Sequence, residues 1–409
     1  MRIAVIEGDG IGKEVIPEAV SIISRCSDLF GFPVEFDNIE GGAEYLKKTG
    51  CEWDEDSFER CKRADAVLLG AVGLPGVRLG GAGETGSKII FGLRMGLDLY
   101  ANVRPVKLYP GVMHMVNATH KRIWNEVDFV IVRENTEDLY TPVKGILSRG
   151  GAEELAVDTR IITRKGAQRV IDFGFQLALI RSAEKRNCSR AMTRSRRTGS
   201  GMNGQDRYHW IPVSKNMDLS GIKTSGVKNP KVTCVDKSNV MAGCRLFRQV
   251  FDEVSLNYSV QKECCYVDAF AMNIVRQPEN YDVVVTSNLM GDILSDLGAA
   301  LQGGLGMAPS GNIGDSHAVF EPVHGSAPDI AGKNVANPIG AILSASMMLE
   351  WVGEKRKDKR MLNASTAIEK AVISLVKKGK ILPVDIGGNA KCTETGRAIH
   401  NLIHEPTVI

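Results

Sequence analysis

Short runs of apolar residues alternate with stretches of helical periodicity along most of the chain. Strands are predicted at residues 3–6, 33–36, 66–69, 129–132, 231–235, 261–267 and 282–287, with a weaker alternating pattern at 155–163. Helices are predicted to include residues 13–26, 87–94, 164–186, 341–350 and 366–378. Repeated alternation of strand and helix is typical of an α/β fold.

The first predicted strand leads into the glycine-rich turn Glu7-Gly8-Asp9-Gly10-Ile11-Gly12-Lys13. This turn departs from the dinucleotide fingerprint G-x-G-x-x-G, because the third glycine would fall at Lys13. The glycines are explained either by the backbone of a strand-to-helix turn or by a close approach of the backbone to a ligand, and we favour the second explanation.

Two stretches interrupt the alternation. Residues 70–86 are rich in glycine and predict a loop at the edge of the sheet. Residues 187–229 change abruptly to Ser, Gly, Arg, Lys and Asn, which predicts an exposed or disordered insertion at about 188–229. A nucleic-acid role for this basic insertion is conceivable but not favoured, since few aromatic residues are interleaved with its charges.

A pair of carboxylates follows the predicted strand at 282–287. Asp292 and Asp296 are four residues apart, so a helix places both on one face. Like charges at this spacing repel, which favours a divalent cation between them. Solvated carboxylates near a helix start are the alternative.

Three arginines lie at or near the ends of predicted elements: Arg94, Arg104 and Arg133. Each could be an ordinary surface or ion-paired residue. Together they could hold a polycarboxylate, because a guanidinium binds a carboxylate with two parallel hydrogen bonds. The runs beginning at Asp236 and Asp268 also place polar residues where predicted strands end, the usual position of α/β sites.

Length and composition narrow the class of protein. The 409 residues, 43% of them hydrophobic, are enough for two domains. A net charge of +3 does not by itself indicate nucleic acid or a membrane. Nine cysteines without a framework spacing predict reduced thiols. No signal peptide or membrane-length apolar stretch is visible, so we expect a soluble, cytoplasmic protein.

Several motifs together resemble the isopropylmalate/isocitrate dehydrogenase family of β-decarboxylating hydroxyacid dehydrogenases. They are the run from Glu7 to Gly12, Arg94, Arg104-Pro105, Arg133-Glu134-Asn135, Asp236-Lys237-Ser238-Asn239, the run from Asn288 to Asp296, and the run from His324 to Lys333. The resemblance implies a two-domain α/β fold, with a discontinuous large domain at 1–105 and 301–409. The small domain at 106–300 would carry the dimer interface.

The resemblance also assigns roles. Asp268, Asp292 and Asp296 would bind Mg²⁺ or Mn²⁺, and Lys237 and Asp268 would reach the site from the partner subunit of a homodimer. A metal-bound hydroxyl is acidified, and a lysine close to cationic groups can serve as its base. Lys237 is therefore the expected base and Tyr140 the acid. The residues expected to bind substrate are Ile90, Phe91, Arg94, Arg104, Arg133 and Asn239.

Asp329 indicates the cofactor, since in this family a carboxylate at that place accepts hydrogen bonds from the adenosine ribose and repels a 2′-phosphate. NAD is therefore expected rather than NADP. The predicted cofactor residues are His324, Gly325, Ser326, Ala327, Asp329, Ile330 and Asn337.

The substrate is expected to be a 2-hydroxy dicarboxylate. Ile90 and Phe91 form an apolar wall that favours 3-isopropylmalate, and hence leucine biosynthesis, by about 1–3 kcal/mol. Lys88 could instead pair with an extra carboxylate, so isocitrate and homoisocitrate stay open, as do malate and tartrate. A non-catalytic regulatory subunit is the alternative from another class, although the intact set of expected catalytic and metal residues argues against it.

Overall fold

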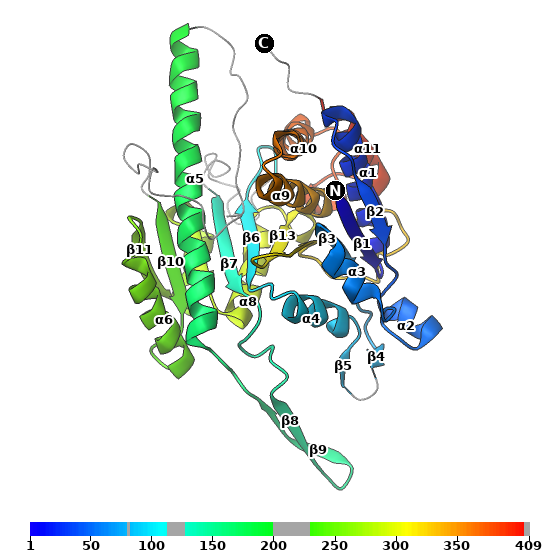
Figure 1. Ribbon diagram of the computed structural model, residues 1–409, viewed down its shortest axis with the longest axis vertical. Helices are drawn as coiled ribbons and strands as arrows, with labels where there is room; N and C mark the ends of the chain where they lie inside the picture. The colour runs from blue at the N-terminus through cyan, green and yellow to red at the C-terminus, as the bar shows by residue number, and fades with distance from the viewer. Residues whose placement is uncertain (80–81, 113–126, 199–229, 405–409) are drawn as a thin grey trace.

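A mixed sheet of ten strands runs through the part of the chain that the computed structural model describes, residues 1–79, 82–112, 127–198 and 230–404 (Figure 1). Its strands, in spatial order, are β11 (Gln261–Tyr266), β10 (Lys231–Asp236), β12 (Val283–Thr286), β7 (Asp128–Glu134), β6 (Ala101–Lys107), β13 (Pro309–Ile313), β14 (Ala318–Pro322), β3 (Ala66–Ala71), β1 (Arg2–Gly8) and β2 (Glu35–Asn38). Both flanks are parallel, whereas β6 and β13 are antiparallel to their neighbours.

Helices cover both faces of the sheet (Figure 1). They are α1 (Gly12–Phe30), α2 (Ala43–Thr49), α3 (Ser57–Arg63), α4 (Ser87–Gly96), α5 (Arg164–Thr198), α6 (Ala242–Ser255), α7 (Val267–Arg276), α8 (Asn288–Leu301), α9 (Ile339–Arg356), α10 (Lys359–Lys378) and α11 (Cys392–Leu402). Short 3-10 turns occupy Pro278–Asn280, Leu305–Met307 and Val384–Ile386. The described part of the chain is thus a layered α/β structure, as the alternation of elements predicts.

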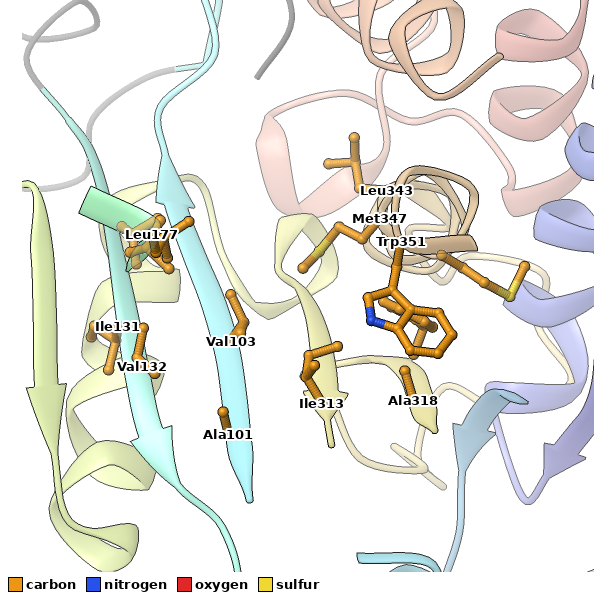
Figure 2. Packing of buried hydrophobic residues seen from close by; sticks show 14 of the residues in the cluster. Ala101, Val103, Ile131, Val132, Leu177, Ile313, Ala318, Leu343, Met347 and Trp351 are labelled. Atoms are coloured by element: carbon orange, nitrogen blue, oxygen red, sulfur yellow. The ribbon is translucent and has the colours of Figure 1, made fainter. Parts of the chain in front are cut away.

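Alternate residues of β1 enter two different hydrophobic cores, because successive side chains of a strand point to opposite faces. Ile3 and Val5 belong to the larger core, while Ala4 and Ile6 join a smaller core with α3 and α4. Figure 2 shows part of the larger core, where Met347 and Trp351 of α9 face β13 and β14. Full burial of such side chains contributes about 1.5–3 kcal/mol each.

The chain passes from one half of the sheet to the other after β6 and returns at β13. The strand β6 pairs with β7 on one side and with β13 on the other, although β6 and β13 are about 200 residues apart in sequence. The segment between β6 and β13 therefore forms one half of the sheet, and the two ends of the chain form the other. The two-domain boundaries at 105 and 300 stay a prediction.

Several features differ from the sequence-based prediction, among them two strands, β13 and β14, that were not predicted. The helix α5 continues to Thr198, so the predicted irregular insertion begins too early at 187. The hairpin of β8 (Lys144–Arg149) and β9 (Ala152–Asp158) projects from the body, whereas only a weak strand from 155 was predicted (Figure 1). A short hairpin, β4 (Arg78–Leu79) and β5 (Ala82–Glu84), lies inside the predicted loop at 70–86. The rest of the predicted insertion, 199–229, lies outside the described residues.

Candidate active site

The three arginines singled out from the sequence come together beside α8. Arg133, at the end of β7, is almost fully buried, and its guanidinium donates to Asn288 Oδ1 at 2.9 Å and to Asp292 Oδ1. Arg104, on β6, lies 3.4 Å from both Asp292 and Asp296. Arg94, on α4, pairs with Glu321 of β14 at 3.3 Å. The predicted cluster of arginines is therefore present, and it faces carboxylates.

Burial and the neighbouring positive charges lower the pKa of two of these arginines, Arg133 and Arg104. Burial, followed by the charges of Arg104 and Arg94, lowers the pKa of Arg133 to about 9. Burial likewise lowers the pKa of Arg104. Cations held so closely together are stabilised by anions, and so the cluster suits a ligand with more than one carboxylate.

Asp292 joins the cluster to a phenol. Tyr140 donates to Asp292 Oδ2 at 2.6 Å, and its ring stacks 5.3 Å from the Arg133 guanidinium. Burial and the Asp292 carboxylate raise the pKa of Tyr140. Burial would raise the pKa of Asp292 too, but the charges of Arg133 and Arg104 outweigh it and lower that pKa. Tyr140 therefore keeps its proton beside an ionised carboxylate.

Asp296 lies one turn further along α8, as predicted. Its carboxylate is more than half exposed, and burial of the remainder raises its pKa despite Arg104 nearby. Ser295, between the two carboxylates, accepts from Arg104 at 2.6 Å. Asp292 and Asp296 thus present oxygens on one face of a helix that begins at the carboxyl end of a parallel strand.

The start of α8 is positioned by the loop that carries Tyr140. Asp138, fully buried and at a positive φ of 74°, accepts from the Leu289 N–H in the first turn of α8 at 3.1 Å. Its other oxygen accepts from Arg160 at 2.6 Å, and Arg160 also donates to Ser287. Tyr140 and Asp292 are therefore held in one framework.

At Gly291 of α8 the structure leaves no room for a side chain. A Cβ at Gly291 would lie 2.7 Å from the Cβ and Cγ of Arg133. The Arg133 side chain can therefore pass close to the helix backbone and reach both Asn288 and Asp292.

Lys237 and Asp268 lie at the ends of the neighbouring strands β10 and β11. Their side chains pair with one another at 2.6 Å, and this hydrogen bond lowers the pKa of Asp268. Asp268 is exposed in the first turn of α7. Among the described residues of a single chain, no three His, Cys, Asp or Glu side chains gather in a way that could hold a metal. One chain therefore brings Asp292 and Asp296 together without Asp268.

The donor chemistry nevertheless fits a hard divalent cation. Carboxylate oxygens are the ligands that Mg²⁺ and Mn²⁺ prefer. Asp292 and Asp296 supply such oxygens from one helix face. The arginines beside them could bind a carboxylate ligand that also coordinates the cation.

The predicted cofactor segment follows β14 and rests on the first turn of α1. The Ile11 N–H donates to the Ser326 carbonyl at 2.9 Å, and the Gly332 N–H donates to Glu14 at 2.6 Å. A Cβ on Gly10 would lie 2.0 Å from the Ser326 oxygen. The glycine turn thus makes a close approach to its own chain, while its approach to a ligand stays a prediction.

Within this segment the predicted cofactor residues differ in exposure. Gly325 and Asp329 are exposed, Ala327 and Ile330 are half-buried, and Ser326 is buried. Burial lowers the pKa of His324, whose Nε2 is buried and makes no hydrogen bond among the described residues. A buried ring nitrogen of this kind can bind a polar ligand group.

Asn337 is held from two sides. Its amide nitrogen lies 3.1 Å from both oxygens of Asp385, and its oxygen accepts from the Ile339 N–H at 2.9 Å. Burial raises the pKa of Asp385. Asp385 was not predicted as a site residue.

The residues expected to contact the variable part of a substrate lie mainly on α4. Phe91 packs against Tyr140, with ring centroids 6.0 Å apart. Ile90 packs against the smaller core, so Phe91 is the better placed of the two to face the arginine cluster. Lys88 is exposed one turn before Phe91. Asn239 is exposed in the turn after β10, next to Lys237.

Several residues that shape the site were missed from the sequence: Asn102, Asp138, Arg160, Asn288, Asn312 and Glu321. Most of them contact residues more than 100 positions away. Asn102 orients Arg104, and Asn312 orients Glu321. Their only sequence signal is a polar residue inside or just after an apolar strand.

The site combines buried arginines, carboxylates and a phenol. Such a set of groups suits an enzyme that acts on a polycarboxylate. Comparison with known families agrees. The family model for isocitrate/isopropylmalate dehydrogenase matches residues 2–197 and 194–399. The chain belongs to the isocitrate/isopropylmalate dehydrogenase family.

Known relatives differ in the substrate that their names give. A 3-isopropylmalate/3-methylmalate dehydrogenase of Methanocaldococcus jannaschii is 39% identical over 406 residues, 99% of each chain. A homoisocitrate dehydrogenase of the same organism is 39% identical over 415 residues, covering 99% of this chain and 98% of the relative. The crystal structure of isocitrate dehydrogenase from Methylococcus capsulatus matches with a TM-score of 0.75 at 30% identity, covering 99% of each chain.

The expected family, fold class and enzyme class are therefore confirmed. The protein is an oxidatively decarboxylating dehydrogenase. Members of this family generally depend on a nicotinamide nucleotide and a divalent metal, act on small molecules and form dimers. Among the described residues, no helix has both the length and the apolar character needed to cross a bilayer.

Proposed function

We propose that the protein is an NAD-dependent dehydrogenase that oxidatively decarboxylates 3-isopropylmalate, a step of leucine biosynthesis, with Mg²⁺ or Mn²⁺. The observation that supports this most is the pairing of Arg104 and Arg133 with Asp292, beside Tyr140. Arg94, which pairs with Glu321, adds a third positive charge that acts on Asp292. These arginines would hold the two carboxylates of a substituted malate. Phe91 would contact its apolar substituent.

The chain's own groups then divide the work of the reaction. Asp292 and Asp296, with Asp268 of the partner, would bind the metal, which when bound acidifies the substrate hydroxyl and stabilises an enolate. Lys237 would accept the hydroxyl proton. Tyr140 keeps its proton beside Asp292 and would return one to the enolate carbon after CO₂ leaves.

The preference for NAD rests on Asp329. Its carboxylate is exposed in the segment that Ile11 and Glu14 anchor. In that position it can accept hydrogen bonds from ribose hydroxyls and would repel a 2′-phosphate.

Lys237 and Asp268 would act in the partner's site, which requires a homodimer. Two observations support this proposal. On α7 and α8, Met272 is 51% exposed and Ile293, next to Asp292, is 63% exposed. The projecting hairpin also exposes apolar residues, namely Ile146, Leu147, Leu155 and Val157. Exposed apolar side chains on neighbouring positions commonly mark an interface.

Homoisocitrate is the second candidate substrate, and Lys88 is the observation that favours it. Its exposed ammonium lies on the Phe91 side of α4, where it could pair with a third carboxylate. A relative with 39% identity also carries that name.

Steady-state kinetics would decide between these substrates. The purified protein should be assayed with NAD and Mg²⁺ against 3-isopropylmalate, isocitrate, homoisocitrate, malate and tartrate. The proposal expects the highest kcat/KM with 3-isopropylmalate, and Lys88→Ala should leave that value largely unchanged. If the protein prefers homoisocitrate and Lys88→Ala removes that preference, homoisocitrate and not 3-isopropylmalate is the substrate.

A further inference from the structure

Two cysteines on neighbouring strands lie side by side at the edge of the sheet. Cys234 of β10 and Cys264 of β11 are paired in register. Neighbouring strands are about 4.8 Å apart, which lies within the Cα separation of about 4.4–6.8 Å that a disulfide needs. Residues paired in this way point to the same face of the sheet, which places the two thiols next to each other.

The two thiols differ in environment. Cys234 is fully buried, and burial raises its pKa. Cys264 is exposed on the edge strand. The neighbouring Cys234 thiol, together with the charge of Arg248, lowers the pKa of Cys264. An accessible thiol of lowered pKa next to a second thiol is the arrangement of a reactive cysteine and its resolving partner.

We propose that Cys264 and Cys234 form a reversible disulfide when the protein meets a peroxide. The Cys264 thiolate attacks one peroxide oxygen, which breaks the O–O bond, forms a sulfenic acid and releases hydroxide. The Cys234 sulfur then attacks the Cys264 sulfur and displaces the sulfenic oxygen as water. In total, two thiols and one hydrogen peroxide give one disulfide and two waters. The inference does not depend on the proposed substrate or cofactor.

The neighbouring Cys265 provides an internal control. It lies on the same edge strand, but side chains alternate along a strand, so it points to the face opposite Cys264. Its register partner on β10 is Val235. Burial raises the pKa of the Cys265 thiol. Cys265 should therefore remain a thiol while Cys264 reacts.

A soft-metal site would be the other use of adjacent thiols. Asp236 lies close by, with the Cys234 sulfur 3.7 Å from its Oδ2, but both Asp236 oxygens accept from Arg248. Within the described ranges, these side chains form no metal-binding group. The geometry therefore favours redox chemistry over a metal.

The test is peptide mapping of the reduced, folded, full-length protein after brief treatment with hydrogen peroxide. Free thiols are alkylated, and the protein is unfolded and digested with trypsin. Cleavage after Lys231 and Lys262 leaves Cys234 in the peptide 232–237 and Cys264 in the peptide 263–276. The expected result is a cross-link between these peptides through Cys264, with Cys265 alkylated, and complete reversal by dithiothreitol.

Variants make the assignment specific. Cys264→Ser should abolish the cross-link, whereas Cys265→Ser should retain it. Retained helical circular dichroism would show that each variant is folded. Sulfinic or sulfonic acid on Cys264 without a cross-link, a cross-link through Cys265, or unchanged thiols at peroxide levels that oxidise a model thiol would each overturn the proposal.

Discussion

Both carboxylate oxygens of Asp292 are engaged inside the chain, one by Arg133 and the other by Tyr140. At the scale of single residues, the side chains of the site are therefore positioned by ion pairs and hydrogen bonds with one another. Replacing one member changes both a direct contact and the charge balance of the others. Arg133 and Asp329 can each be tested by one substitution, because the proposed role of each depends on a single charged group.

Arg133→Lys should lower kcat/KM by at least about tenfold. Lysine cannot reach Asn288 and Asp292 together, and a hydrogen bond to a charged group contributes about 1.5–3 kcal/mol. Kinetics of the variant measure this loss, and Arg63→Lys, exposed on α3, serves as the matched control. Equal activity of the two variants would contradict a role for the guanidinium.

Asp329→Lys should shift the preference from NAD towards NADP by at least about tenfold, or about 1.4 kcal/mol. The new ammonium would attract the 2′-phosphate that the carboxylate repels. The ratio of kcat/KM for the two nucleotides is the measurement. Asp28→Lys, the same charge change on the exposed face of α1, should leave the ratio alone. An unmoved ratio in both variants would remove the cofactor argument.

At the scale of elements, the sequence predicts best where an element's own residues decide its structure. The apolar runs of β3, β7 and β12 and the helical start of α8 follow from local pattern. The strand β13, with the sequence Pro-Ser-Gly-Asn-Ile, has little strand propensity, and its pairing with β6 and β14 determines it. The hairpin β8–β9 was missed because both of its faces are exposed, so no clean alternation marks it.

Site residues follow the same division. Asp292 and Asp296 could be predicted because their relation lies within one helix. The role of Asp138 could not, because it depends on a contact with Leu289 about 150 positions later. The wall of Ile90 and Phe91 stays a prediction, and the structure adds that Ile90 packs on the side of α4 that meets the smaller core. Sequence spacing alone does not say which side of a short helix meets the core.

Asp37 joins three elements and provides a test of stability against pH. Its carboxylate on β2 accepts from Arg60 of α3 and from Arg2 of β1, and these bonds lower the pKa of Asp37. A lowered folded pKa gives stability that is present above the ordinary value of about 3.9 and is lost as the pH falls through the folded value.

Asp37→Asn should therefore cost about 1 kcal/mol of unfolding free energy at pH 7, a figure reduced for the partly exposed arginines. The difference from the natural protein should shrink below about pH 4. Denaturant unfolding at several pH values measures it, with Asp28→Asn as the exposed control. A cost that stays constant down to pH 3 would show that the carboxylate's charge contributes nothing.

At the scale of the whole molecule, the question is whether one chain alone can form a complete active site. Asp292 and Asp296 lie on α8, while Lys237 pairs with Asp268 at the ends of two other strands. A symmetric dimer contains each such set twice, and in a shared site one chain would complete the other.

Mixing two inactive variants tests this sharing. Lys237→Ala and Asp292→Asn should each abolish turnover. After subunit exchange, half of the dimers are mixed and each contains one intact site, so activity should recover to roughly a quarter of normal. The proportion of mixed dimers can be measured by native mass spectrometry. Mixed dimers without activity would show that each chain builds its site alone.

The ladders at the centre of the sheet differ in length. β6 is aligned with β7 over seven residue pairs, from Ala101 to Lys107, but with β13 over only three, from Ala101 to Val103. Because β6 and β13 remain paired, the two halves of the chain are joined by a continuous sheet rather than by a free linker. A change in the relative orientation of Arg94 on α4 and of Arg104 on β6 would therefore have to bend that sheet.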